Sequence, residues 1–92
     1  MKRVRMLPKK LYHGERIEAR EFAKDGFFAR VDLFESPEDV LKFIPKPCDV
    51  YRINPFKLVR KQLFVTDHPE AKIYNYYENI PKEHVYERMT YR

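Results

Sequence analysis

Seven prolines divide this chain of 92 residues into short segments. A proline lacks a backbone N–H, so it interrupts a helix interior and a central strand alike. The prolines are spread along the chain, at Pro8, Pro37, Pro45, Pro47, Pro55, Pro69 and Pro81. The sequence therefore predicts several short elements in place of long helices.

Length and composition indicate one compact domain over residues 1–92. Seven Phe and seven Tyr supply an aromatic content of 15%, which excludes a disordered chain. The size excludes a two-domain enzyme, and a single cysteine excludes a disulfide scaffold. We interpret Cys48 as a partly buried small hydrophobic residue in a reducing compartment, with a catalytic thiol as the less favoured alternative.

The first half of the chain predicts one strand and one hairpin. Residues 2–7 read as a short strand, and residues 15–23 and 27–34 read as a hairpin whose loop ends in Gly26. The rival prediction is a helix over residues 15–24, because Glu, Arg, Ala and Lys favour helices and Gly26 stands just past the end.

A short helix is predicted after Ser36, which is followed by proline and two acidic residues in the first turn. Residues 49–53 read as a strand, and 63–65 with 71–77 as a second hairpin. Residues 56–62 stay open, and residues 82–91 read as a helix or a last strand. The fold class is therefore α+β: a small antiparallel sheet of about five strands, formed by hairpins, with one or two short helices on one face.

Positive charge is concentrated in two blocks of the sequence. Residues 1–20 carry a net charge of +5 and residues 51–66 a net charge of +4, while the whole chain carries +5. If the two blocks are neighbours in the fold, they form a surface that attracts phosphate backbones or an acidic protein.

Aromatic residues are interleaved with the basic blocks, as on a platform that stacks unpaired bases between phosphate contacts. The first hypothesis is therefore a small non-enzymatic protein that binds nucleic acid. The predicted contact residues are Lys2, Arg3, Arg5, Lys9, Lys10, Tyr51, Arg52, Phe56, Lys57, Arg60 and Lys61. The competing interpretation of each aromatic is core packing on a half-buried strand.

The second hypothesis is a protein-interaction module, such as an inhibitor or accessory subunit encoded by a virus or a mobile element. Its partner would be an acidic protein surface or a second copy of the chain. Tyr74, Tyr76 and Tyr77 are the predicted partner contacts, because tyrosine is enriched at interfaces. The competing interpretation is an amphipathic edge strand.

Signatures of an enzyme are sparse. Two isolated glycines cannot form a phosphate-binding loop, and the three histidines lack metal-ligand spacing, so we expect neither cofactor nor metal. A metal-independent ribonuclease is the third hypothesis. Size, charge and the ending Val85-Tyr86-Glu87-Arg88 resemble small bacterial toxin nucleases that cleave messenger RNA, but their N-terminal helical hairpin is not evident. The resemblance would implicate His84, Tyr86 and Arg88.

No apolar run approaches the length that spans a bilayer, and the basic N-terminus lacks the apolar stretch of a signal peptide. We therefore expect a cytoplasmic protein with no membrane contact. The chain has only one Ser and one Gln. Charged and aromatic residues stand in place of small polar ones, a bias that favours a thermophilic source.

Overall fold

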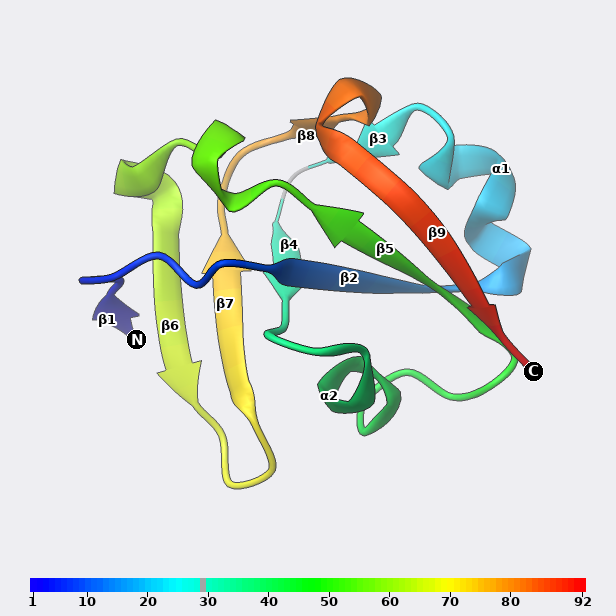
Figure 1. The fold of residues 1–92 in the computed structure, drawn as a ribbon, viewed down its shortest axis with the longest axis horizontal. Helices are drawn as coiled ribbons and strands as arrows, with labels where there is room; N and C mark the ends of the chain where they lie inside the picture. The colour runs from blue at the N-terminus through cyan, green and yellow to red at the C-terminus, as the bar shows by residue number, and fades with distance from the viewer. Residues whose placement is uncertain (29) are drawn as a thin grey trace.

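A computed structural model describes residues 1–28 and 30–92 (Figure 1). The strands are β1 (Lys2–Arg3), β2 (Leu11–Arg16), β3 (Gly26–Phe27), β4 (Val31–Leu33), β5 (Cys48–Ile53), β6 (Leu63–Asp67), β7 (Lys72–Tyr76), β8 (Ile80–Pro81) and β9 (Val85–Tyr91). The helices are α1 (Arg20–Ala23) and α2 (Pro37–Leu41), with 3-10 turns at Ile17–Ala19, Pro55–Lys57, Arg60–Gln62 and Lys82–His84.

Every strand pairing is antiparallel, and the strands form three sheets in the described part of the chain. Their orders are β1-β6-β7-β4, β2-β5-β9 and β3-β8. The predicted mixture of antiparallel sheet and short helices is confirmed in outline. The count of about five strands is too low, because two-residue strands such as β1 and β8 carry no periodicity that a sequence pattern can reveal.

A single bridge joins the two larger sheets. Tyr12 of β2 and Phe34, just after β4, exchange two backbone hydrogen bonds of 2.8 Å. The sheets curve around the larger of two cores, which contains Leu11, Leu33, Ile53, Leu63 and Tyr76. Beyond the bridge, β2 and β4 have no further backbone pairing among the described residues, and the sheet splits there.

The smaller core lies between α2 and the face of β2 and β5 that bears Tyr12 and Val50, whereas Leu11 and Tyr51 on the opposite face belong to the larger core. Val40 packs there against Tyr12, Phe34 and Val50. Gly14 permits this close approach, because a Cβ at that position would lie 2.3 Å from Val40 Cγ1. The glycine in β2 therefore serves helix packing.

The predicted hairpin over residues 15–34 is wrong. β2 pairs with β5 and β4 pairs with β7, while Ile17–Ala23 form a 3-10 turn and α1, close to the rival helix prediction. Gly26 follows α1 with a φ of 105° and a Cβ position only 2.3 Å from the Ile80 carbonyl oxygen, so only glycine fits. Strand β2 therefore ends where the hairpin was expected to begin.

Other predictions are confirmed. Ser36 caps α2 by accepting a hydrogen bond of 3.1 Å from the Asp39 amide. β6 and β7 form the second hairpin, and β5 covers the strand expected at 49–53. Residues 82–91, for which the sequence allows a helix or a strand, form a 3-10 turn at Lys82–His84 followed by strand β9. Of the strand expected over residues 2–7, only Lys2 and Arg3 pair. In the described part of the chain, no helix has the length and apolar content needed to cross a membrane.

Candidate nucleic-acid interface

The two basic blocks meet where β1 pairs with β6. In this pairing Lys2 is opposite Val65 and Arg3 is opposite Phe64. The Arg60 guanidinium, just before β6, donates hydrogen bonds to the carbonyl oxygens of Val4, at 3.4 Å, and of Arg5. Arg3, Arg60 and Lys61 line one hollow of about 230 Å³. The fold therefore gathers side chains from both basic blocks at one edge of the sheet.

A row of side chains crosses all four strands of this sheet. The register places Arg3 opposite Phe64, Phe64 opposite Asn75, and Asn75 opposite Asp32. Residues that are directly opposite in antiparallel strands share one face. Leu63, Val65, Tyr74 and Tyr76 belong to the other face, which packs on the larger core. We call the side that bears Arg3 and Phe64 the outer face.

Two aromatic rings stand side by side on the outer face. The rings of Phe64 and Tyr77 make an edge-to-face contact with centroids 5.8 Å apart. Tyr77 continues the ladder by donating its amide N–H to the Gln62 carbonyl at 3.0 Å. Phe64 is partly buried and Tyr77 is exposed. The outer face thus presents aromatic surface beside the basic edge.

At the end of the row away from Arg3, the side chains form a polar network. Thr66 donates its hydroxyl to Asn75 Oδ1 at 2.7 Å, and Asn75 donates its amide to Asp32 Oδ1 at 3.0 Å. Arg30 Nε lies 3.4 Å from the same Asp32 oxygen. Asn75 is buried, so the network fixes the orientation of its neighbours.

The remaining predicted nucleic-acid contacts do not join this row. Lys2 pairs with Asp67 at 3.0 Å, and Lys9 and Lys10 are exposed between β1 and β2. Phe56 and Lys57 are exposed on the 3-10 turn after β5.

Strand β5 carries two more of these predicted contacts. Arg52 lies over the ring of Tyr86, with its guanidinium carbon 5.6 Å from the ring centroid. Tyr51 is buried in the larger core, which leaves its ring no face for a base, so its proposed stacking role is withdrawn.

The predicted tyrosine contact surface is reduced to Tyr77. Tyr74 and Tyr76 share a face, as the alternation predicts, but that face is the buried one. Tyr76 accepts a hydrogen bond of 2.8 Å from the Val59 amide, and Tyr74 donates one of 2.5 Å to Glu35. Burial, helped by this hydrogen bond to Glu35, raises the pKa of Tyr74 above its ordinary value. Both rings therefore have structural roles and cannot anchor a partner.

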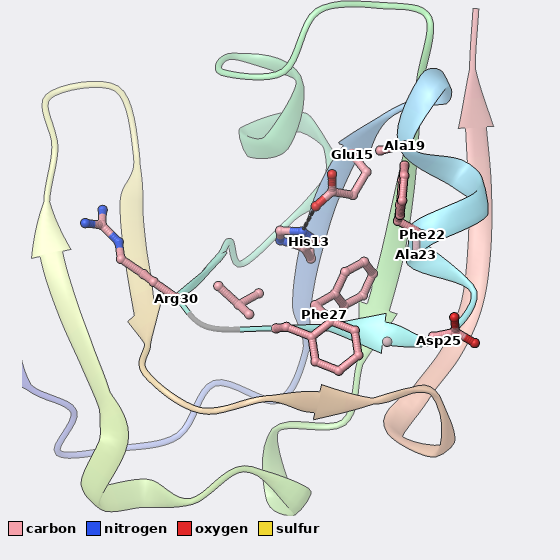
Figure 2. Close-up of a pocket in the computed structure, with 11 residues that line it drawn as sticks. His13, Glu15, Ala19, Phe22, Ala23, Asp25, Phe27 and Arg30 are labelled. Carbon is pink, nitrogen blue, oxygen red and sulfur yellow. Dashed lines mark hydrogen bonds and ion pairs between the residues drawn. The ribbon is translucent and has the colours of Figure 1, made fainter.

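A hollow of about 320 Å³ opens where β2 and β4 diverge. Figure 2 shows His13 and Glu15 projecting side by side from β2, with Phe22 and Ala23 of α1 near them and Phe27 below. His13 Nδ1 lies 2.7 Å from the Asp32 carbonyl oxygen, and Nε2 lies 2.5 Å from Glu15 Oε2. A carbonyl oxygen only accepts, so this contact assigns the donor role to Nδ1.

Sequence reasoning overlooked this pair. His13 and Glu15 are two positions apart, so on a strand they share a face. The pattern would have revealed them if residues 11–16 had been read as a strand, but Glu15 was assigned to a hairpin.

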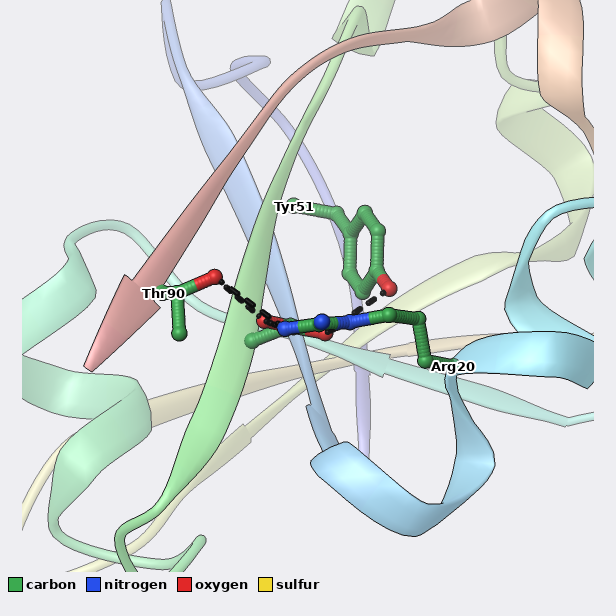
Figure 3. A network of polar contacts seen from close by, with 4 residues as sticks. Arg20, Tyr51 and Thr90 are labelled. Carbon is green, nitrogen blue, oxygen red and sulfur yellow. Dashed lines mark hydrogen bonds and ion pairs between the residues drawn. The ribbon is translucent and has the colours of Figure 1, made fainter. Parts of the chain in front are cut away.

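A second overlooked feature is the buried carboxylate of Asp49. Figure 3 shows Arg20, Tyr51 and Thr90 converging on it. Arg20 donates two hydrogen bonds of 2.8 Å and Thr90 donates one of 2.7 Å. The Arg20 hydrogen bond is the main reason that the pKa of Asp49 falls to about 2. Since all its oxygens are engaged, this network stabilises α1 on β5 and β9.

The ribonuclease hypothesis implicated three residues near the C-terminus. Tyr86 and Arg88 line one hollow of about 410 Å³ together with Lys24 and Lys82, whereas His84 is not among its lining residues. Cys48 is fully buried, and burial is the main reason that its thiol pKa is raised. This environment disfavours the thiolate that a nucleophile requires.

Within residues 1–28 and 30–92, no three His, Cys, Asp or Glu side chains gather in a way that could hold a metal ion. No protein-family model matches the chain, and no curated protein matches it at significant similarity. The geometry described above is therefore the basis for a functional hypothesis.

Proposed function

We propose that the protein binds single-stranded nucleic acid across the outer face of the β1-β6-β7-β4 sheet. The observation that carries the proposal is the pairing of Arg3 with Phe64, with Tyr77 in contact with the Phe64 ring. A cation for the phosphate backbone thus stands beside rings on which bases can stack, the combination that single-strand binders use.

The charges at the edge support phosphate contacts. Arg3, Arg5 and Lys61 are exposed, and within residues 1–28 and 30–92 none of the three forms an ion pair. Arg60 is different, since it donates to backbone carbonyls and so holds the N-terminal segment against the turn before β6. It keeps its charge while it fixes the position of Arg5. Binding by these groups is expected to weaken steeply with salt.

Unpaired bases suit the outer face better than a duplex does. Base faces are available for stacking only when the strand is single, whereas a duplex presents groove edges and phosphates. Three inter-strand spacings separate β1 from β4, about 14 Å, which a short stretch of extended strand can cross. The row from Arg3 through Phe64 and Asn75 to Asp32 runs perpendicular to the strands. A nucleic-acid strand that follows it would run from the basic edge toward the place where β2 and β4 separate.

The experiment is a fluorescence anisotropy titration of the full chain with a short labelled oligo(dT) and with a duplex of equal length. We expect tighter binding of oligo(dT), with an affinity that falls between about 50 and about 200 mM salt. Absence of binding at the lowest salt would overturn the proposal. Equal affinity for the duplex would overturn the single-strand part of it.

The competing partner is an acidic protein surface, which would also respond to salt. An acidic polypeptide such as poly(Glu), titrated as a competitor, separates the two classes because it has carboxylates and no bases. If poly(Glu) displaces oligo(dT) at equal charge concentration, the aromatic rings contribute nothing and the nucleic-acid proposal fails.

A further inference from the structure

The hollow between β2 and β4 has features of a binding site that the sheet row does not use. It has aromatic side chains at its rim, an acceptor group inside and a volume at the lower end of the range for small-ligand sites. We propose that this hollow binds one guanine base of the nucleic-acid strand. The inference rests on the proposed function, because it assigns a base preference to the same protein.

Two phenylalanines at the rim are unusually exposed. Phe22 on α1 is 78% exposed and Phe28, just after β3, is 59% exposed, although both line the hollow. A large apolar ring left in water forgoes the stabilisation that its burial would give. Two such rings at one opening, on two different segments, fit a site where a flat ring enters and is contacted from both segments.

Two carboxylates contribute hydrogen-bond acceptors to the lining of the hollow. Glu15 and Asp25 both line it, and a carboxylate can only accept hydrogen bonds when ionised. His13 has both ring nitrogens engaged, one with Asp32 and one with Glu15. Glu15 Oε1 has no hydrogen-bond partner among the described residues. His13 is therefore a positioning residue that holds the Glu15 carboxylate through Oε2 and leaves Oε1 available to a ligand.

The Glu15 carboxylate can select a base by the N–H groups that the base donates to it. Guanine presents the N1–H and N2–H donors next to each other on its Watson–Crick edge. Glu15 Oε1 can accept from one of them, and Oε2 can accept from the other through the lone pair that His13 does not use. Adenine and cytosine place a ring-nitrogen acceptor beside the amino group, and thymine and uracil place carbonyls on both sides of the N3–H. Those acceptors would face the carboxylate and repel it, so guanine is the one standard base that fits.

The position of the hollow connects it with the outer-face row. Asp32 ends the row with its side chain and accepts the His13 hydrogen bond with its backbone carbonyl. Arg30 lines the hollow, and its Nε lies 3.4 Å from Asp32 Oδ1. A strand that leaves Phe64 along the row thus reaches the rim of the hollow.

The test compares the four ribonucleoside monophosphates and inorganic phosphate by amide NMR titration of the full chain. We expect guanosine monophosphate to shift amides of residues 13–28 and to bind at least about tenfold more tightly than adenosine monophosphate, the factor that corresponds to about 1.4 kcal/mol. Phe22→Ala and Phe28→Ala should each weaken this binding about tenfold, as expected for a lost stacking contact. Glu15→Gln should remove the preference for guanine.

Phe56→Ala is the matched control, since Phe56 is 72% exposed but lies on the turn after β5, outside the hollow. Equal shifts with inorganic phosphate, equal affinity for the two purines, or an equal loss with Phe56→Ala would each overturn the guanine site. Oligo(dT) contains no guanine. Its binding therefore reports on the proposed sheet interface alone. If the hollow does not bind guanine but oligo(dT) still binds, only the guanine site is wrong and the proposed function stands.

Discussion

Arg20 and Asp49 form a two-point ion pair in which both guanidinium–carboxylate distances are 2.8 Å. Asp49 is fully buried on β5, and Arg20 reaches it from the start of α1. The pair connects residues 29 positions apart in the chain and attaches the start of α1 to β5. A further hydrogen bond of 3.3 Å from Arg20 to the Thr90 hydroxyl attaches α1 to β9 as well.

Removing the arginine should destabilise the fold. Arg20→Ala leaves a buried carboxylate with only hydroxyl donors, so we expect the free energy of unfolding to fall by about 3 kcal/mol. Urea denaturation followed by far-UV circular dichroism measures it. Arg16→Ala is the matched control because Arg16 is exposed, and it should change stability by less than about 0.5 kcal/mol. Equal effects of the two substitutions would contradict the structural role of the pair.

The same pair predicts a pH dependence. The pKa of Asp49 is lowered from 3.8 to about 2 in the folded state, mainly by the Arg20 hydrogen bond. A lowered pKa gives stability that is fully present above the unfolded value and is lost as pH falls through the folded value. The wild-type protein should therefore lose about 2 kcal/mol between pH 5 and about pH 2 from this group. Urea midpoints across that range should show a flatter slope in Arg20→Ala, and an unchanged slope would refute the assignment.

The two glycines should differ in their tolerance of a methyl group. A Cβ at Gly26 meets the Ile80 backbone oxygen at 2.3 Å and requires a positive φ, whereas a Cβ at Gly14 meets only side-chain atoms of Val40 and Ile44. We expect Gly26→Ala to cost about 3 kcal/mol and Gly14→Ala between about 1 and about 2 kcal/mol. Thermal unfolding of the two variants measures the difference. The reverse order would show that β3 does not pair with β8 as described.

Cys48 should be unreactive in the folded protein. Its side chain is fully buried and burial raises its thiol pKa, so both access and thiolate fraction are reduced. Labelling with a neutral thiol reagent at pH 8 should proceed only as fast as the protein opens, and it should accelerate in denaturant. Rapid labelling in native buffer would instead revive the catalytic interpretation of this residue.

Local signals in the sequence predicted part of this fold well. The serine cap of α2 and the β6–β7 hairpin depend on neighbouring residues, and both appear as expected. The partners of β2 and β4 could not be predicted in the same way, because β5 and β7 lie more than 30 positions away and residues 15–24 favour helix and strand about equally. Pairing over such distances depends on the packing of the whole core.

The candidate site was likewise predictable from the sequence only in part. The charge blocks indicated a basic surface, and β1 does bring residues of both blocks together. Burial was harder to predict: Tyr51, Tyr74 and Tyr76 are core residues, while Phe22 and Phe28 are exposed. Alternation along a strand shows which residues share a face but not which face is covered. That depends on elements elsewhere in the chain.

The most direct test of the sheet interface compares two substitutions that remove one positive charge each. Arg3→Gln removes the cation opposite Phe64, and Lys46→Gln removes an exposed cation between α2 and β5. The measurement is the slope of log affinity for oligo(dT) against log salt concentration. We predict that Arg3→Gln reduces the slope by about 0.7, the value for one phosphate contact on a single strand, while Lys46→Gln leaves it unchanged. Equal slopes for the two variants would show that the outer face does not bind the strand.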